Sequence, residues 1–204
     1  MHLLDQKILG ITILLLLGIL VIAKRTATGS ALDIPQGDFL VRLVNFFNLF
    51  FLLVVNPAAA LLLILRRLEA GDPTRIAIGE PGFLIALGLV GLVLYVAGFL
   101  LMAWAMLSLG RNYQLAGASP RNTDAMIKDG PYRLIRHPMY AAALGISLGL
   151  ACLIQSIAFF SVFCIYVVLI LLLVPFEERG LQHAYGEEYA AYRQRTPRLF
   201  PFIH

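Results

Sequence analysis

The sequence predicts an all-α integral membrane protein with about five transmembrane helices. The last two form a helical hairpin, and a C-terminal amphipathic helix lies at the membrane interface. Of the 204 residues, 60% are hydrophobic and only 14% are charged, which leaves more apolar surface than a soluble domain of this size can bury. Several apolar stretches also reach the length of about 20 residues that a helix needs to cross the hydrocarbon layer. The chain therefore requires a bilayer as its solvent.

The charge distribution and the cysteines argue against two other classes of protein. The formal net charge is +4, without the basic block or aromatic-basic patch that a nucleic-acid groove needs, so no nucleic-acid partner is expected. Cys152 and Cys164 stand singly in apolar stretches. Without CxxC spacing or a companion histidine cluster, they predict neither a metal site nor a disulfide framework.

The first expected span covers residues 3–23 and is followed by Lys24 and Arg25. A cleavable signal peptide is the alternative interpretation. However, the apolar run is long, the charge of Lys7 is balanced by Asp5, and the small residues after Arg25 form only a weak cleavage site. We therefore expect a membrane anchor.

The second expected span, residues 39–65, carries polar residues along one face, namely Asn45, Asn48 and Asn56. That face should look into the helix bundle, and the helix should kink near Pro57. The polar residues are candidates for lining a substrate chamber, although interhelical hydrogen bonding is the commoner role of such residues.

The third expected span, residues 83–109, is interrupted only by small residues and Trp104. It closes a region of three membrane helices, residues 1–109, ahead of a polar segment that opens the second region, residues 110–204. Asn45, Asn48 and Trp104 are the candidate substrate-binding residues of the first region.

The second region begins with a polar segment and continues into the predicted hairpin. The apolar run 139–153 breaks at Gln155 and Ser156 and resumes over residues 157–174, which predicts two helices joined by a tight turn. The following residues 175–195 are too polar to cross the membrane and form the expected interfacial helix.

The interfacial helix has an apolar stripe that includes Leu181, Tyr185 and Tyr189. Counting back three residues from Leu181 places Glu178 on the inward stripe, while Glu177 is turned by about 100°. Glu178 is therefore the carboxylate expected to face the site. The alternative is a pair of solvated acids at a helix start, where they favour the helix dipole.

Lysine and arginine gather in the segment after the third span and in the C-terminal tail, which places both ends of the hairpin on the cytoplasmic side of the inner membrane. Five crossings then place the N-terminus outside. The basic residues concerned are Arg111, Arg121, Lys128, Arg133, Arg136, Arg179, Arg193, Arg195 and Arg198, whereas Arg66, Arg67 and Arg75 fall on the outer side.

The densest polar cluster, residues 130–140, stands at the entrance of an apolar helix. Pro138 favours the first helical position and makes His137 a plausible cap. A helix start flanked by Arg136 and His137 suits an anion such as an amino-acid carboxylate. The alternative is a membrane-edge anchor built from a snorkelling arginine and an interfacial tyrosine.

Residues 110–201 carry a series of short motifs whose order and spacing resemble the isoprenylcysteine carboxyl methyltransferase (ICMT) family and its bacterial and archaeal relatives. A helical hairpin separates the His-Pro motif from the Glu-Glu motif, as the family pattern requires. The matching motifs are Leu109-Gly110-Arg111-Asn112-Tyr113, Lys128-Asp129-Gly130-Pro131-Tyr132-Arg133, Arg136-His137-Pro138-Met139-Tyr140, Val174-Pro175-Phe176-Glu177-Glu178, Tyr185-Gly186-Glu187-Glu188-Tyr189 and Pro197-Arg198-Leu199-Phe200-Pro201.

This resemblance implies a membrane enzyme that transfers a methyl group from S-adenosylmethionine to a lipophilic or membrane-embedded acceptor, leaving S-adenosylhomocysteine. It implies a cofactor pocket at the cytoplasmic membrane edge, closed by the C-terminal segment, with Arg136 and Glu178 as catalytic candidates. The residues expected to bind the cofactor are Gly130, Tyr132, Leu134, His137, Pro138, Tyr140, Glu178 and Arg198. We expect no metal ion in the site.

The acceptor is less defined, because relatives that methylate prenylated cysteine tend to carry an arginine where this chain has Leu171-Leu172-Leu173. An isoprenylcysteine carboxylate, another isoprenoid acid, a phospholipid amine or a small hydrophobic molecule all remain candidates. Two other functions also remain: a membrane reductase that uses NADPH, resembling the sterol and steroid reductases, and a non-enzymatic scaffold or transport component. The Glu-Glu pair followed by Tyr-Gly-Glu-Glu-Tyr favours the methyltransferase.

Overall fold

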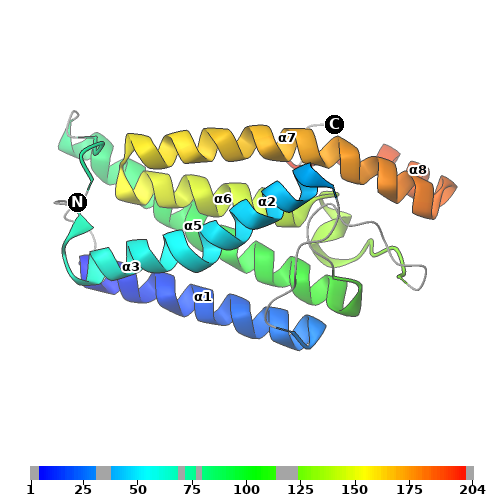
Figure 1. Ribbon diagram of the computed structural model, residues 1–204, viewed down its shortest axis with the longest axis horizontal. Helices are drawn as coiled ribbons and strands as arrows, with labels where there is room; N and C mark the ends of the chain where they lie inside the picture. The colour runs from blue at the N-terminus through cyan, green and yellow to red at the C-terminus, as the bar shows by residue number, and fades with distance from the viewer. Residues whose placement is uncertain (1–4, 31–37, 69–71, 77–79, 114–123, 201–204) are drawn as a thin grey trace.

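The computed structural model describes residues 5–30, 38–68, 72–76, 80–113 and 124–200, and within them nearly all regular structure is helical. The helices run alongside one another in an elongated bundle (Figure 1). The predicted all-α class is therefore confirmed. The main helices are α1 (Gln6–Thr28), α2 (Phe39–Phe50), α3 (Asn56–Ile64), α5 (Pro81–Leu109), α6 (Pro138–Ile154), α7 (Ile157–Tyr185) and α8 (Glu187–Arg195).

Four of the described helices are long and apolar enough to cross a membrane, with bounds Gln6–Thr28, Phe39–Ile64, Pro81–Asn112 and Ile157–Tyr185. The fifth expected crossing, α6, has 17 residues. At 1.5 Å per residue it is about 25 Å long, shorter than the hydrocarbon layer of about 30 Å. The protein is a multi-pass integral membrane protein, and α6 is its short, mostly buried helix.

Small residues let α5 and α6 pack closely. A Cβ atom added at Gly149 would lie 2.6 Å from the backbone nitrogen of Tyr95, and one added at Gly98 would lie 2.8 Å from Cγ1 of Ile146. Helix association in lipid depends on such close backbone approach. The glycines therefore fix the position of α6, whose first residues build the site described below.

The irregularity predicted near Pro57 occurs one turn earlier, as a π-helical segment at Phe51–Val55 between α2 and α3. The Asn56 side chain donates a hydrogen bond from Nδ2 to the carbonyl of Phe51 at 2.7 Å and accepts one from the Tyr95 hydroxyl. The side chain thus satisfies a carbonyl in the irregular turn and fixes the span against α5. Asn56 has the interhelical role that was the alternative to substrate contact.

The tight turn between the hairpin helices lies where the sequence predicts it. Gln155 has φ of 58° and closes α6 through a hydrogen bond from its backbone N–H to the carbonyl of Ala151 at 2.8 Å. Residues 72–76 cover this turn, because Ile76 donates to the Gln155 carbonyl and Ile157 donates to the Thr74 carbonyl. The hairpin end remote from the polar cluster is thereby fixed.

The boundary between the last span and the interfacial helix differs from the predicted one, which fell at residue 175. Helix α7 continues through Pro175 to Tyr185, and among the described residues α8 is the only separate helix that follows it. With 29 residues, α7 is about 43 Å long and projects beyond a hydrocarbon layer of about 30 Å. A proline inside a membrane helix is tolerated where neighbouring elements supply compensating contacts. Next to Pro175, Leu173 and Val174 are buried in a core cluster that includes residues of α2 and α6.

The ends of α1, α5 and α7 and the start of α6 lie at the same end of the bundle, beside α8 (Figure 1). Lys24, near the end of α1, places Nζ 5.4 Å from the ring centroid of Tyr113. Arg66 lies at the opposite end and pairs with Asp5 at 3.1 Å. The basic segments that the sequence analysis assigns to the cytoplasmic side therefore lie at one end of the bundle. Arg121 lies outside the described residues. Which side of the membrane this end faces stays a prediction.

Candidate active site

The site is built where the start of α6 meets the final turns of α7. His137 caps α6 with φ of −123° and ψ of 63°, outside the helical region, as expected for the residue before Pro138. The tail runs alongside it: the backbone N–H of Arg136 donates to the Pro197 carbonyl at 2.8 Å, and that of His137 donates to the Arg198 carbonyl at 3.0 Å. Two segments separated by the whole hairpin are thus joined.

Glu178 lies at the centre of a cluster formed with Arg136, His137 and Arg198. Its Oε1 atom lies 2.8 Å from Nη2 of Arg136 and 3.3 Å from Nε2 of His137. Its Oε2 atom accepts a hydrogen bond from Nη2 of Arg198 at 2.8 Å. His137 and Glu178, which the resemblance implies as residues of one cofactor pocket, therefore lie side by side. Both carboxylate oxygens of Glu178 are already engaged.

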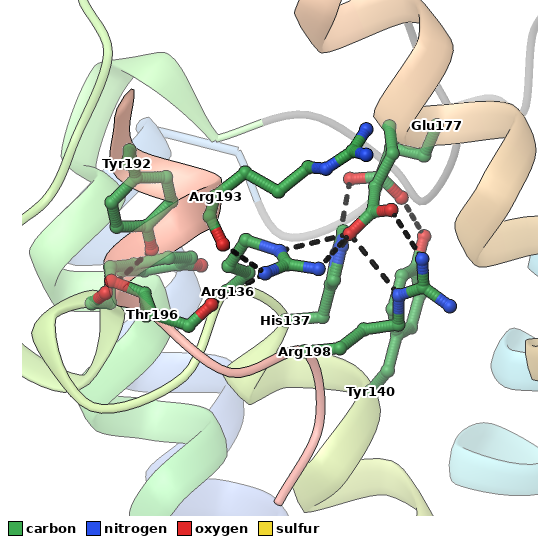
Figure 2. Close-up of polar contacts among 10 residues, drawn as sticks. Arg136, His137, Tyr140, Glu177, Tyr192, Arg193, Thr196 and Arg198 are labelled. Atoms are coloured by element: carbon green, nitrogen blue, oxygen red, sulfur yellow. Dashed lines mark hydrogen bonds and ion pairs between the residues drawn. The ribbon is translucent and has the colours of Figure 1, made fainter. Parts of the chain in front are cut away.

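Arg136 is held from both sides. Its Nε donates to Glu178 at 2.9 Å, while Nη1 donates to the backbone carbonyls of Arg193 and Thr196 (Figure 2). The side chains of Arg136 and Glu178 are only 7% and 5% exposed. A buried charge is tolerated when it is paired and hydrogen-bonded in this way. Arg136 thus joins α6, α7 and the segment after α8.

Glu177 is the carboxylate that faces the cavity. It accepts a hydrogen bond from the Tyr140 hydroxyl, and its Oε1 lies 4.0 Å from Nδ1 of His137. The rings of His137 and Tyr140 stack at 5.5 Å between centroids. The helical spacing from Leu181 predicted that Glu178 would face inward. Glu178 is indeed buried, but the carboxylate that lines the cavity is Glu177.

The cavity has a volume of about 220 Å³ and runs from this polar cluster into the apolar interior. Its polar end combines the cluster with α8 and the loop before α6; its other end lies between α2, α5 and α6. The polar part is lined by Asn112, Tyr113, Asp124, Tyr132, Arg136, His137, Pro138, Tyr140, Glu177, Tyr185, Tyr189 and Tyr192, and the deeper part by Asn45, Asn48, Phe51, Leu52, Met102, Met106, Ala143, Ile146 and Tyr166.

The stripe predicted for the C-terminal segment faces this cavity, since Leu181, Tyr185, Tyr189 and Tyr192 all line it. The Tyr192 hydroxyl donates to the Tyr132 carbonyl at 2.5 Å. Burial raises the pKa of Tyr132, Tyr189 and Tyr192 well above the usual value for a phenol. These hydroxyls therefore remain protonated near neutral pH.

Two of the predicted substrate-binding residues line the deeper part of the cavity. Asn48 accepts a hydrogen bond from the Tyr166 hydroxyl across the α2–α7 contact, and Asn45 donates to the Val41 carbonyl at 2.9 Å. Both side chains therefore have a packing role as well as a place on the cavity wall.

Other predicted site residues lie elsewhere. Trp104 and Leu134 are 47% and 55% exposed, and neither is part of the cavity wall. Gly130 has φ of 60° and packs against Ser108 and Trp104, so it shapes the turn before α6 without lining the cavity. Arg198 contacts Glu178 but is not part of the cavity wall.

Comparison with known proteins decides the family. Residues 87–188, half of the 204 residues, match the family described as phospholipid methyltransferase. The chain belongs to this family. The matched residues contain α6 with its preceding turn and α7 with Glu177 and Glu178. The parts of the polar site that come from α6 and α7 therefore lie within the matched segment, whereas Tyr189 and Tyr192 of α8 lie just beyond it.

Two relatives illustrate the similarity. The chain is 32% identical over 119 residues to the cobalt-zinc-cadmium resistance protein CzcN of Cupriavidus metallidurans, covering 58% of this chain and 49% of that protein. It is 29% identical over 119 residues to protein-S-isoprenylcysteine O-methyltransferase B of Arabidopsis thaliana, covering 56% and 59%. The chain thus spans about half the length of these relatives.

The fold also resembles that of a solved eukaryotic intramembrane Ras methyltransferase, ICMT, with a TM-score of 0.54 and 18% identity. The match covers 95% of this chain and 85% of that chain. At this identity the likeness concerns the fold. Together with the plant relative, it confirms the resemblance to the ICMT family that the motifs indicated.

Proposed function

We propose that this protein is an S-adenosylmethionine-dependent methyltransferase acting on a lipophilic acceptor that enters from the bilayer. The observation that carries the proposal is the continuous cavity, which joins a charged cluster at one end of the bundle to the apolar space between α2, α5 and α6. A polar cofactor and an apolar acceptor need such a site, with one polar end and one apolar end. The membership of a methyltransferase family supports the same chemistry.

The side chains at the polar end fit the amino-acid part of the cofactor, which carries an ammonium and a carboxylate. Glu177 faces the cavity and supplies a negative charge, whereas Glu178 is already engaged by Arg136 and Arg198. We therefore assign the ammonium to Glu177 and the carboxylate to His137 and the start of α6. Glu178 is the positioning residue that holds Arg136 and His137 in place.

When bound, S-adenosylmethionine supplies an activated methyl group on a sulfonium. The protein then has to hold the acceptor in line and exclude water, which are the main contributions of a site to such a displacement. Tyr132, Tyr140 and Tyr192 line the polar end with large apolar rings. The backbone bonds from Arg136 and His137 to the tail hold the start of α6 in place. These residues orient the reactants and limit solvent.

The acceptor's apolar part would occupy the deeper cavity and extend between the helices. A volume of about 220 Å³ is below the range of about 300–1,000 Å³ that is usual for pockets enclosing a drug-sized ligand. A long lipid chain therefore has to continue into the bilayer. Asn45 and Asn48 are placed to contact the acceptor, and a prenylated carboxylate or a related lipid fits this arrangement. A carboxylate acceptor needs no general base.

The arrangement of basic segments supports a site that faces the cytoplasm. Lys128 and Arg133 precede α6, and Arg193 and Arg195 lie in the last turn of α8. The start of α6 and the helix α8 lie at the same end of the bundle (Figure 1). Short loops rich in lysine and arginine remain on the cytoplasmic side. The cofactor would then enter from the cytoplasm and the acceptor from the membrane.

Binding of the cofactor product tests the proposal most directly. Purified protein in detergent should bind S-adenosylhomocysteine in calorimetric titrations and should give no heat with NADPH. Glu177→Gln should weaken binding about tenfold or more, the loss of one charge-assisted hydrogen bond. Glu187→Gln, an exposed acid on α8, is the matched control and should bind like wild type. Binding of NADPH instead of S-adenosylhomocysteine would support a reductase.

The acceptor class follows from a second experiment. Membrane lipid extracts incubated with the protein and a radiolabelled methyl donor should give a labelled, organic-soluble product. Alkaline hydrolysis separates the classes, because a methyl ester releases labelled methanol whereas an N-methylated lipid keeps its label. Label that enters no lipid fraction contradicts a lipophilic acceptor.

A further inference from the structure

Tyr189 is a buried tyrosine whose hydroxyl has no hydrogen-bond partner within the part of the chain that the structure describes. It lies in the first turn of α8, is 1% exposed and lines the cavity. Its ring packs against Tyr192 at 6.2 Å between centroids. A buried hydroxyl that finds no partner destabilises a folded protein, so such groups are rare and call for an explanation.

Other tyrosines in this protein show that the fold usually supplies a partner. Tyr95 donates to Asn56, Tyr140 to Glu177, and Tyr192 to the Tyr132 carbonyl. Tyr192 and Tyr189 belong to the same short helix and line the same cavity. Packing of α8 therefore does not by itself leave a hydroxyl unsatisfied, and Tyr189 is a specific exception.

The surroundings of Tyr189 indicate which ligand would satisfy it. Tyr189 lines the cavity together with Arg136, His137 and Glu177, which belong to its polar end. This end of the cavity is where the charged amino-acid part of the cofactor fits, whereas the acceptor's chain fits the apolar end. A neutral phenol can donate to an oxygen or a nitrogen and accept from an ammonium or a hydroxyl, so it suits a ligand that has all of these groups.

We propose that the Tyr189 hydroxyl forms a hydrogen bond with the bound cofactor and is a cofactor-binding residue of this site. The inference rests on the proposed function and assigns a cofactor contact to α8, whose Tyr192 lines the same end of the cavity. The fold thus carries a hydroxyl that is costly in the empty protein and useful in the complex.

Tyr189→Phe tests this, because it removes only the hydroxyl and keeps the ring. We expect the Kd for S-adenosylhomocysteine to rise by about 3- to 10-fold, the value of one neutral hydrogen bond. The Tm of the ligand-free protein should stay the same or rise, since an unsatisfied buried group is removed. A residue with a merely structural role would show a lower Tm.

Tyr95→Phe is the matched control, because Tyr95 is fully buried, is hydrogen-bonded to Asn56 and lies away from the cavity wall. Its Tm should fall and its Kd should stay unchanged. An unchanged Kd in Tyr189→Phe, or a fall in the Tm of that ligand-free variant, would overturn the inference while leaving the proposed function intact. A wild-type protein that fails to bind S-adenosylhomocysteine would overturn the proposed function and the inference with it.

Discussion

Arg136 and Glu178 are 42 positions apart in the chain, yet Nη2 of Arg136 lies 2.8 Å from Oε1 of Glu178 in a buried ion pair. This pair joins the start of α6 to the last turns of α7. Both Arg198 and His137 add to it through Glu178. The carboxylate of Glu178 is therefore the common partner of all three side chains in the cluster.

Removing Glu178 should destabilise the protein strongly. Glu178→Ala leaves Arg136 buried without its counter-charge, which typically costs about 3–5 kcal/mol. Thermal unfolding in detergent, followed by circular dichroism, measures the effect. Glu188→Ala is the control, because it breaks the exposed Lys128–Glu188 pair and should cost less than about 1 kcal/mol. Equal losses in the two variants would mean that the buried cluster does not stabilise the fold.

Adding a methyl group at the α5–α6 contact should also destabilise the protein. A Cβ atom at Gly149 would lie 2.6 Å from the Tyr95 nitrogen, within the backbone of the facing helix. Gly149→Ala should therefore cost about 1–3 kcal/mol through overpacking. Gly18→Ala has nothing within 4 Å of the added carbon and should be neutral or stabilising. A higher Tm for Gly149→Ala would show that α5 and α6 do not pack this closely.

Alkaline pH should weaken the folded state. Burial raises the pKa of Tyr132, Tyr189 and Tyr192 above the ordinary value of 10.0, so the folded protein keeps protons that the unfolded chain releases. A raised folded pKa gives stability that is present below the unfolded pKa and is lost as pH rises above it. The Tm should fall above about pH 10, and less steeply in a Tyr189→Phe Tyr192→Phe double variant. Identical slopes would contradict the burial of these hydroxyls.

The membrane orientation can be tested with reporters fused after the last residue. If the basic end of the bundle faces the cytoplasm, green fluorescent protein at the C-terminus should fluoresce and alkaline phosphatase at the same position should be inactive. If five crossings separate the two ends, as the sequence predicts, a reporter fused ahead of residue 1 should give the opposite result. An active C-terminal phosphatase would place the site on the outer side.

Much of the fold could be predicted because hydropathy and turn residues act locally. The expected span at residues 83–109 corresponds to α5, and the break at Gln155 and Ser156 ends α6 where expected. The convergence of His137 and Glu178 also followed from the sequence, since an antiparallel hairpin returns the chain to the end at which it began.

The details of the site depended on tertiary contacts that no local pattern contains. Which carboxylate faces the cavity is decided by Arg136 and Arg198, which engage Glu178 and leave Glu177 to the cavity wall. The end of α7 was misplaced for a similar reason: packing around Pro175 sustains the helix past a residue that usually breaks it. The resemblance around Gly130 implied a binding role for Leu134, but Leu134 is exposed and does not line the cavity.

The backbone bonds that tie Pro197 and Arg198 to the residues before α6 have a consequence for biosynthesis. Membrane helices insert one after another as the ribosome delivers them, but these bonds need a stretch that is synthesised after the final crossing. Insertion of the bundle and formation of these bonds are therefore separate events. A nascent chain that stops before Thr196 would reside in the membrane without the contacts that hold Arg136 and His137 at the start of α6.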